Sequence, residues 1–157
     1  MKPLENHMTV TDLETISAAD FGRSLRGLGI NLLVRDVLST QQFLSAVFGM
    51  RSARVSADFA MMLYSEQIFQ LHADTTYHSH PLPSLLPENG ARGAGLAICL
   101  FDTDPDTAIE LAGINPHDST ILEPPSNKPH GLRECTILCE NGYAWVASRP
   151  LSENESI

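Results

Sequence analysis

Gly27-Leu28-Gly29-Ile30-Asn31-Leu32-Leu33-Val34-Arg35-Asp36 nearly recurs 66 residues later as Gly93-Ala94-Gly95-Leu96-Ala97-Ile98-Cys99-Leu100-Phe101-Asp102. Each copy reads Gly-x-Gly, then an apolar run of strand length, then an aspartate that introduces a polar turn and a helix-like stretch. The repeat is longer than the roughly 20 to 50 residues of a solenoid unit, and two copies are too few to stack as one. We therefore interpret the chain as two half-domains that share one sheet, with a small-molecule cleft at their join.

Length and charge limit the class of protein. At 157 residues the chain fits one domain or two fused half-domains. Ten basic and 19 acidic residues, a net charge of -9, argue against nucleic acid or an anionic membrane surface as a partner. No apolar run approaches the roughly 20 residues of a spanning helix, and no basic and apolar leader opens the chain. We expect a cytoplasmic protein whose partner is a small molecule or another protein.

The three cysteines, Cys99, Cys135 and Cys139, all fall in apolar, strand-like segments. Their spacing is not that of a disulfide framework or a zinc site. The sequence therefore predicts buried free thiols in a reducing compartment.

The first half of the repeat has the pattern β-α-β-β-β. An apolar run rich in branched residues predicts a buried strand over 30–34. Ser39 is a candidate helix cap, and an apolar stripe follows it as far as Gly49, a residue typical of helix ends. Three further strands are expected over 51–55, 59–64 and 68–71.

The second half repeats this order. We expect a strand over 96–101, a helix over 105–111, a strand over 120–122, a loop over 123–131, and strands over 134–138 and 143–148. Asn141-Gly142 between the last two strands suits a tight hairpin turn.

The chain divides at these patterns. Residues 1–10 are expected to be disordered, and 11–25 carry apolar residues at a loose helical spacing, with a capping box from Ser17 to Asp20. The predicted organisation is an N-terminal arm docked on the domain or on a partner, a single domain over 27–150, and a polar tail. Its boundaries are 1–26 for the arm, 27–74 for the first module, 75–92 for the linker, 93–150 for the second module and 151–157 for the tail.

Four segments, in this order and duplicated spacing, resemble one family: Ile30 to Val37, Phe43 to Met50, Lys128 to Glu134, and Glu140 to Trp145. The chain resembles the vicinal oxygen chelate superfamily, which includes glyoxalase I, bleomycin resistance proteins and extradiol dioxygenases. The resemblance implies an α+β fold of two βαβββ modules that form a curled mixed sheet around a cleft, usually in a homodimer. It does not imply one reaction, because members isomerise, epimerise, cleave rings, open epoxides or sequester a drug.

The resemblance also places divalent-metal ligands at the first strand and near the end of the last strand of each module. The first-strand positions hold Gly29 with Asn31 next on the same face, and Gly95 with Ala97, while the last strands offer Gln70 and His72, and Ala144 and Val146. Because a catalytic metal usually has three or four protein ligands, we expect no metal and no other cofactor. If a metal does bind, its candidate ligands are Gln70, His72, His78 and His80.

The segment from Lys128 to Glu134 concentrates ionisable side chains before a predicted cleft strand. Arg133 is a candidate planar donor to a ligand, and Glu134 is the best candidate for a catalytic base or an acceptor. The alternative is that both form a structural ion pair while His130 caps a turn. Trp145, with Tyr143 and Phe69, is either an aromatic wall of the cleft or core. The candidate ligand-binding set is Asn31, Gln70, His72, His80, His130, Arg133, Glu134 and Trp145.

Three functions are compatible with this pattern. The leading hypothesis is binding of a small organic molecule without the family metal, in the manner of bleomycin resistance proteins. The second is a metal-dependent lyase, isomerase or dioxygenase that uses His72 with Gln70 and a histidine from the 78–80 loop. The third is an interaction protein with a vestigial cleft, whose N-terminal arm mediates assembly.

Overall fold

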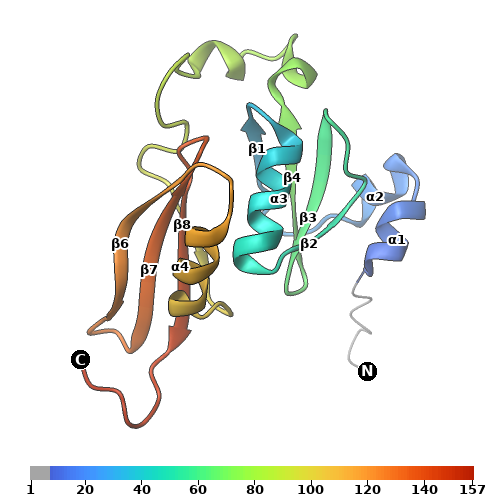
Figure 1. The fold of residues 1–157 in the computed structure, drawn as a ribbon. Helices are drawn as coiled ribbons and strands as arrows, with labels where there is room; N and C mark the ends of the chain where they lie inside the picture. Colours follow the sequence, from blue (N-terminus) through green and yellow to red (C-terminus); the bar gives the residue numbers. More distant parts are fainter. Residues whose placement is uncertain (1–7) are drawn as a thin grey trace, which may run out of the picture.

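The fold is a mixed α+β arrangement of two βαβββ modules, as the repeat predicts (Figure 1). The structure is a computed structural model and describes residues 8–157. Its elements are α1 Val10–Thr15, α2 Ala18–Ser24, β1 Asn31–Val34, α3 Val37–Phe48, β2 Arg51–Ala53, β3 Phe59–Tyr64, β4 Gln67–Ala73, η1 Asp74–Tyr77, η2 Leu82–Leu85, β5 Ala97–Leu100, α4 Pro105–Ile114, β6 Ser119–Asn127, β7 Leu132–Cys139 and β8 Ala144–Pro150.

Each module builds its own four-stranded mixed sheet. Sheet 1 has the order β1-β4-β3-β2 and sheet 2 the order β5-β8-β7-β6, so the expectation of one sheet shared by both halves is wrong. In both sheets the first strand runs parallel to the last and the remaining pairs are antiparallel. Asn31 pairs with Gln70 in sheet 1 and Ala97 with Ala144 in sheet 2. The two modules therefore repeat the same register as well as the same element order.

Helix α3 ends where the sequence predicts but begins earlier. Its N-cap is Asp36, whose carboxylate accepts a hydrogen bond from the backbone N–H of Ser39 at 2.9 Å, so Ser39 is not the cap. An aspartate before the first turn satisfies an otherwise unpaired N–H, which accounts for the earlier start. Gly49 ends the helix in the left-handed conformation, as expected.

Strand β6 is the main error in the expected elements. It runs to Asn127 and includes Pro124 and Pro125, where a loop was expected. β6 is an edge strand, and its pairing with β7 shifts register twice between Ile121 and Ser126. An edge strand with such irregularities tolerates prolines because their missing N–H groups need no partner.

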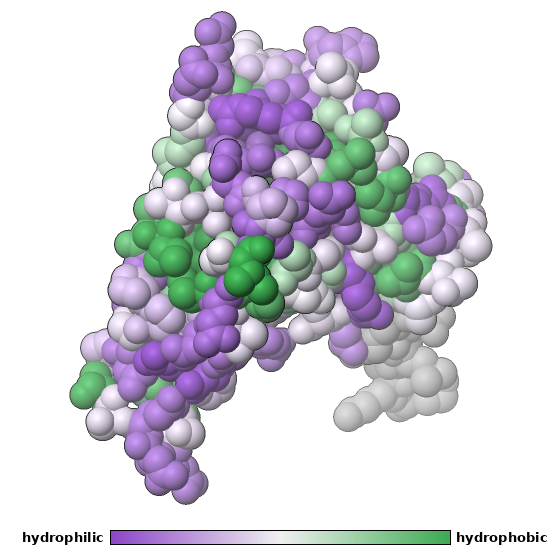
Figure 2. Space-filling view, in the orientation of Figure 1, coloured by the Kyte–Doolittle hydropathy of each residue, from purple (hydrophilic) through white to green (hydrophobic). Residues whose placement is uncertain are grey.

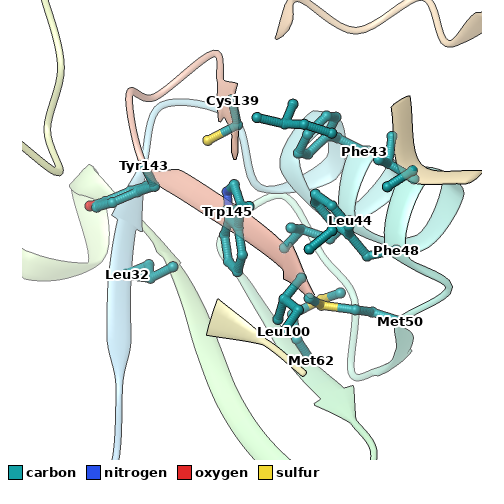
Figure 3. Packing of buried hydrophobic residues seen from close by; sticks show 14 of the residues in the cluster. Leu32, Phe43, Leu44, Phe48, Met50, Met62, Leu100, Cys139, Tyr143 and Trp145 are labelled. Carbon is teal, nitrogen blue, oxygen red and sulfur yellow. The ribbon is translucent and has the colours of Figure 1, made fainter. Parts of the chain in front are cut away.

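The two modules share a core made by their helix-side faces. Helices α3 and α4 lie between the two sheets (Figure 1). Trp145 of β8 is completely buried and points toward α3 (Figure 3). Its ring centroid lies 6.1 Å from that of Phe48 on α3 and 5.9 Å from that of Phe69 on β4. Because one side chain packs against both modules, neither module buries its core alone.

A buried asparagine completes the junction. Asn141, in the turn between β7 and β8, has no exposed surface. Its Oδ1 accepts from the backbone N–H of Arg35 at 2.9 Å, and its Nδ2 donates to Thr40 Oγ1 at 3.0 Å. The adjacent Gly142 has φ +82°, and a Cβ there would lie 2.3 Å from the Cα of Ala91. The turn is therefore shaped to fit the first module and the linker as well as its own hairpin.

The N-terminal arm forms two short helices where one loose helical stretch was expected. Ser17 caps α2 by accepting from the backbone N–H of Asp20, as predicted. The expectation of disorder over residues 1–10 falls mostly outside the described residues, and α1 already begins at Val10. Within residues 8–157, no helix is long and apolar enough to cross a membrane.

The C-terminal tail folds back on sheet 2. Arg149 of β8 donates to both carboxylate oxygens of Glu155 at 2.8 Å and to Asp104 at 2.7 Å. The hydrogen bonds from Arg149, together with one from the backbone N–H of Ser152, lower the pKa of Glu155 to about 2.

Of the cysteines expected to be buried, Cys135 and Cys139 are, but Cys99 is exposed. Cys99 lies on β5, an edge strand, with its side chain on the face away from the helices. The expectation for Cys99 is wrong because its strand is covered on one face only.

Candidate functional site

Each sheet has one face turned away from the helices, which we call its helix-free face. Side chains alternate between the two faces of a strand, so the residues packed in the shared core identify the other set. The helix-free faces of sheets 1 and 2 point in opposite directions, because both helices lie between the sheets (Figure 1). Because the two helices and the shared core lie between the sheets, the candidate sites are these outer faces.

The helix-free face of sheet 2 is an apolar strip with a polar end. The apolar strip consists of Ala97, Cys99, Thr136, Leu138, Ala144 and Val146, which are half-buried or exposed. Glu134 and Ser148 pair across β7 and β8 at one end of the strip. A strip of this kind suits an apolar ligand with one polar group.

Glu134 is the centre of the polar end. Its Oε1 accepts from Ser148 Oγ at 3.2 Å and lies 3.3 Å from His130 Nε2. The Glu134 side chain is only 16% exposed, whereas that of His130 is 58% exposed. Partial burial, together with the Glu134 charge, raises the pKa of the Cys99 thiol nearby. Cys99 is therefore a neutral thiol beside a carboxylate that can accept a further hydrogen bond.

The other end of the strip opens into a cavity of about 600 Å³. Leu138 and Thr120 of sheet 2 line it, together with the β7–β8 turn and the linker residues 88–91. Its charged lining residues are Arg35, Glu88, Asp118 and Glu140. Arg35 Nη2 donates to the carbonyl oxygen of Gly90 at 3.1 Å. Three carboxylates against this one guanidinium give the lining a net negative charge.

No pattern in the sequence indicates this cavity. Its lining comes from a linker, a hairpin turn and two strand ends, which no spacing pattern joins. Only the net charge of the chain pointed to an acidic surface.

The helix-free face of sheet 1 carries Asn31, Gln70 and His72. His72 Nε2 lies 3.1 Å from Gln70 Oε1, and burial lowers the pKa of His72. The His72 ring lies between those of Phe59 and Tyr77, with both centroid distances 5.1 Å. The register brings these side chains to one place, as their spacing predicts.

The three candidate histidines of this region do not converge on one point. His80 contacts His72 only through the Tyr77 ring, whose centroid is 5.3 Å from that of His80. His78 is exposed, and its Nδ1 lies 2.6 Å from the carbonyl oxygen of Thr75.

The residues present do not fit the family metal. Gly29 and Gly95 have no ligating side chain, and Ala144 and Val146 occupy the helix-free face where the second module would supply its ligand. In the described part of the chain, no group of three or more His, Cys, Asp or Glu side chains is placed to hold a metal ion. Gln70 and His72 supply at most two ligands, fewer than a catalytic metal requires.

Two members of the expected ligand-binding set lie on the helix side instead. Arg133 forms a bidentate ion pair with Asp106 of α4, at 2.6 and 2.8 Å, and lowers the pKa of that carboxyl group. Trp145 is completely buried in the shared core. Lys128, beyond the strand, pairs with Glu123. Arg133 and Trp145 therefore hold the fold together, and neither faces the apolar strip.

The paired βαβββ modules, their mixed sheets and the parallel first and last strands define the fold of the vicinal oxygen chelate superfamily. No model of a protein family matches the sequence, and no curated protein sequence matches it.

Solved structures with this fold include proteins from several bacteria. A glyoxalase/bleomycin resistance protein/dioxygenase family enzyme from Burkholderia phytofirmans PsJN is 17% identical with a TM-score of 0.65, over 78% of this chain and 97% of that one. A glyoxalase-related enzyme from Fulvimarina pelagi is 13% identical with a TM-score of 0.61, over 83% and 95%. TioX from Micromonospora sp. ML1 is 19% identical with a TM-score of 0.57, over 81% and 100%. At these identities the likeness shows the fold alone.

Proposed function

We propose that this protein binds a small organic molecule along the helix-free face of sheet 2, without a metal. The ligand has an apolar body and a basic or hydrogen-bond-donating end. The observation that carries the proposal is the Glu134 carboxylate, 16% exposed at the end of an apolar strip.

The strip and the carboxylate select for different parts of such a ligand. Burying apolar surface against Val146, Leu138 and Ala144 contributes roughly 25 cal/mol per Å². Glu134 contacts a hydroxyl and an imidazole, and no lysine or arginine within residues 8–157 forms an ion pair with it. A largely buried carboxylate whose partners are a serine hydroxyl and an exposed imidazole, with no lysine or arginine paired to it within residues 8–157, favours a ligand ammonium or amidine group.

Long-range charge favours the same ligand class. The chain carries a net charge of -9, and three carboxylates line the cavity at the far end of the strip. The cavity lining also contains Arg35, but its net charge is negative, and a cleft with a net charge of one sign raises the local concentration of the opposite ion. Anionic ligands are disfavoured for the same reason.

We further propose a cytoplasmic homodimer in which a second copy helps to cover the ligand. Leu96 and Phe101 flank β5 and are 44% and 57% exposed, while Ile121 and Leu122 of β6 are 45% and 56% exposed. Figure 2 shows a hydrophobic patch on the side of the molecule where β6 lies. Apolar side chains at both edges of one sheet are typical of a surface that another protein covers.

The test compares two ligands that differ in charge. Isothermal titration with naphthalen-1-ylmethylamine and with 1-naphthoate measures the preference, and we expect binding of the amine only. Glu134→Gln should weaken amine binding about tenfold or more, the value of one charge-assisted hydrogen bond. Glu110→Gln, which alters an exposed glutamate on α4, is the matched control.

Equal binding of amine and carboxylate, or an unchanged affinity in Glu134→Gln, would contradict the proposed site. Absence of binding by any apolar amine would favour an interaction protein with a vestigial cleft.

A further inference from the structure

The two helix-free faces occupy equivalent places in the internal repeat, but only that of sheet 1 packs against the N-terminal arm within residues 8–157. Leu13 of α1 is completely buried and Phe21 of α2 is 6% exposed. Both pack in one cluster with Ala53, Met61 and Leu63 of sheet 1. Met61 pairs with Gln70 across the sheet, so the arm lies on the face that carries Gln70 and His72.

Arg54 makes three hydrogen bonds to the described part of the arm. Within residues 8–157, the hydrogen bonds between the arm and the modules all involve Arg54. Its backbone N–H donates to Glu14 Oε1 at 2.7 Å, its Nε to the carbonyl oxygen of Leu13 at 2.6 Å, and its Nη2 to that of Ile16. These two carbonyls lie at the end of α1, where helical partners are lacking.

Arg54 adopts a conformation that is unfavourable for its residue type. Its φ is +51°, in the left-handed region that arginine rarely occupies. The residue directly follows β2 and turns its backbone N–H toward the arm. A strained conformation persists only where surrounding contacts determine it, and here the contacts are those with the arm.

The connection between arm and module has the properties of a hinge. Residues 25–29 are exposed, with Leu28 at 90%, and their hydrogen bonds stay within the arm. Gly27 has φ +69°, and added Cβ atoms at Gly27 and Gly29 would meet nothing within 4 Å. The arm can therefore move without a rearrangement of β1.

We propose that the N-terminal arm is a displaceable cover, latched by Arg54, over a second ligand-binding face on sheet 1. This inference rests on the proposed function, since it assigns to sheet 1 the same class of apolar ligand. Under the arm, Met61, Leu63 and Ile68 supply the apolar surface, and Gln70 supplies a hydrogen-bonding end. A ligand that binds this face competes with the arm and shifts the population toward the open state.

Hydrogen–deuterium exchange on the full chain tests the latch without any ligand. In Arg54→Ala, amides of residues 10–24 should exchange about tenfold or more faster, while those of β7 and β8 keep their rates. Arg54→Gly should do the same, and because glycine accepts the positive φ, this variant folds even if strain destabilises the alanine variant. Arg51→Ala, an exposed arginine three residues earlier with no hydrogen bond to the described arm, is the control.

Binding of the neutral apolar dye Nile red tests the second face. The wild-type signal reports the open face of sheet 2, and the increment in the Arg54 variants reports sheet 1. An added dye site that accompanies faster arm exchange supports the proposal, whether or not the wild type binds dye. If amide exchange in residues 10–24 is unchanged in the Arg54 variants, or rises only together with that of β7 and β8, Arg54 does not hold the arm in place. A released arm without an added dye site overturns the second binding face.

Discussion

Replacing Asn141 with alanine tests whether the β7–β8 turn joins the two modules. The side chain is completely buried and makes two hydrogen bonds to the first module, to the backbone N–H of Arg35 and to Thr40 Oγ1. Thr40 keeps its donor bond to the carbonyl oxygen of Asp36, but Arg35 loses the acceptor of its backbone N–H.

The expected loss follows from these contacts. Two hydrogen bonds contribute about 1 kcal/mol each, and an unpaired backbone N–H in a partly buried site adds about 1 kcal/mol more. The free energy of unfolding should fall by about 3 kcal/mol. For a chain of this size, that corresponds to a decrease in Tm of about 6 to 12 °C.

Urea unfolding followed by the fluorescence of Trp145 measures this loss. Trp145 is the single tryptophan and lies in the core shared by both modules, so its emission reports the junction itself. Asn89→Ala, in the exposed linker, is the control and should change stability by less than about 0.5 kcal/mol. A similarly small change in Asn141→Ala would refute the assigned role of the turn.

Three further predictions concern the titrating and metal-binding groups. Burial holds the pKa of His72 below its ordinary value of 6.5, so the folded state favours the neutral ring. The contribution of the neutral ring to the free energy of unfolding is complete above pH 6.5 and is lost as the pH falls through the folded pKa. His72→Phe keeps a ring between Phe59 and Tyr77 and should reduce the loss of Tm between pH 7 and pH 5, and an unchanged loss would assign it to other groups. In the native protein, N-ethylmaleimide should modify Cys99 first, because Cys99 is exposed while burial raises the pKa of Cys135 to about 11. Mass spectrometry of the digested peptides measures the order of labelling, and faster labelling of Cys135 would contradict the burial pattern. Protein purified without chelator should contain no stoichiometric transition metal by elemental mass spectrometry, whereas one metal per chain that raises Tm would favour the metal-dependent lyase, isomerase or dioxygenase.

Much of the element order could be predicted because it depends on local interactions. Apolar runs after each Gly-x-Gly, the stop at Gly49 and the hairpin at Asn141-Gly142 act over a few residues. β6 could not be predicted in the same way. Its prolines favour a loop locally, and only its position at the edge of sheet 2 makes them compatible with a strand.

The candidate site was predictable in part. The spacing of Gln70 and His72 requires that both lie on one face of their strand, and they do. Alternation also requires that Arg133 and Glu134 point in opposite directions, but it does not say which of them faces a helix. That choice depends on α4, whose Asp106 pairs with Arg133 and leaves Glu134 on the helix-free face.

The sequence alone determines features that depend on residue types and short spacings. These are the duplication, the βαβββ order, the acidic charge and the lack of a full set of metal ligands at the family positions. Contacts between segments far apart in the chain decide the remaining features. These are the separation into two sheets, the burial of Trp145, the cavity beside the linker and the hydrogen bonds of Arg54 to the arm. Such contacts form only when apolar faces from distant segments are buried together, so residue order does not specify them locally.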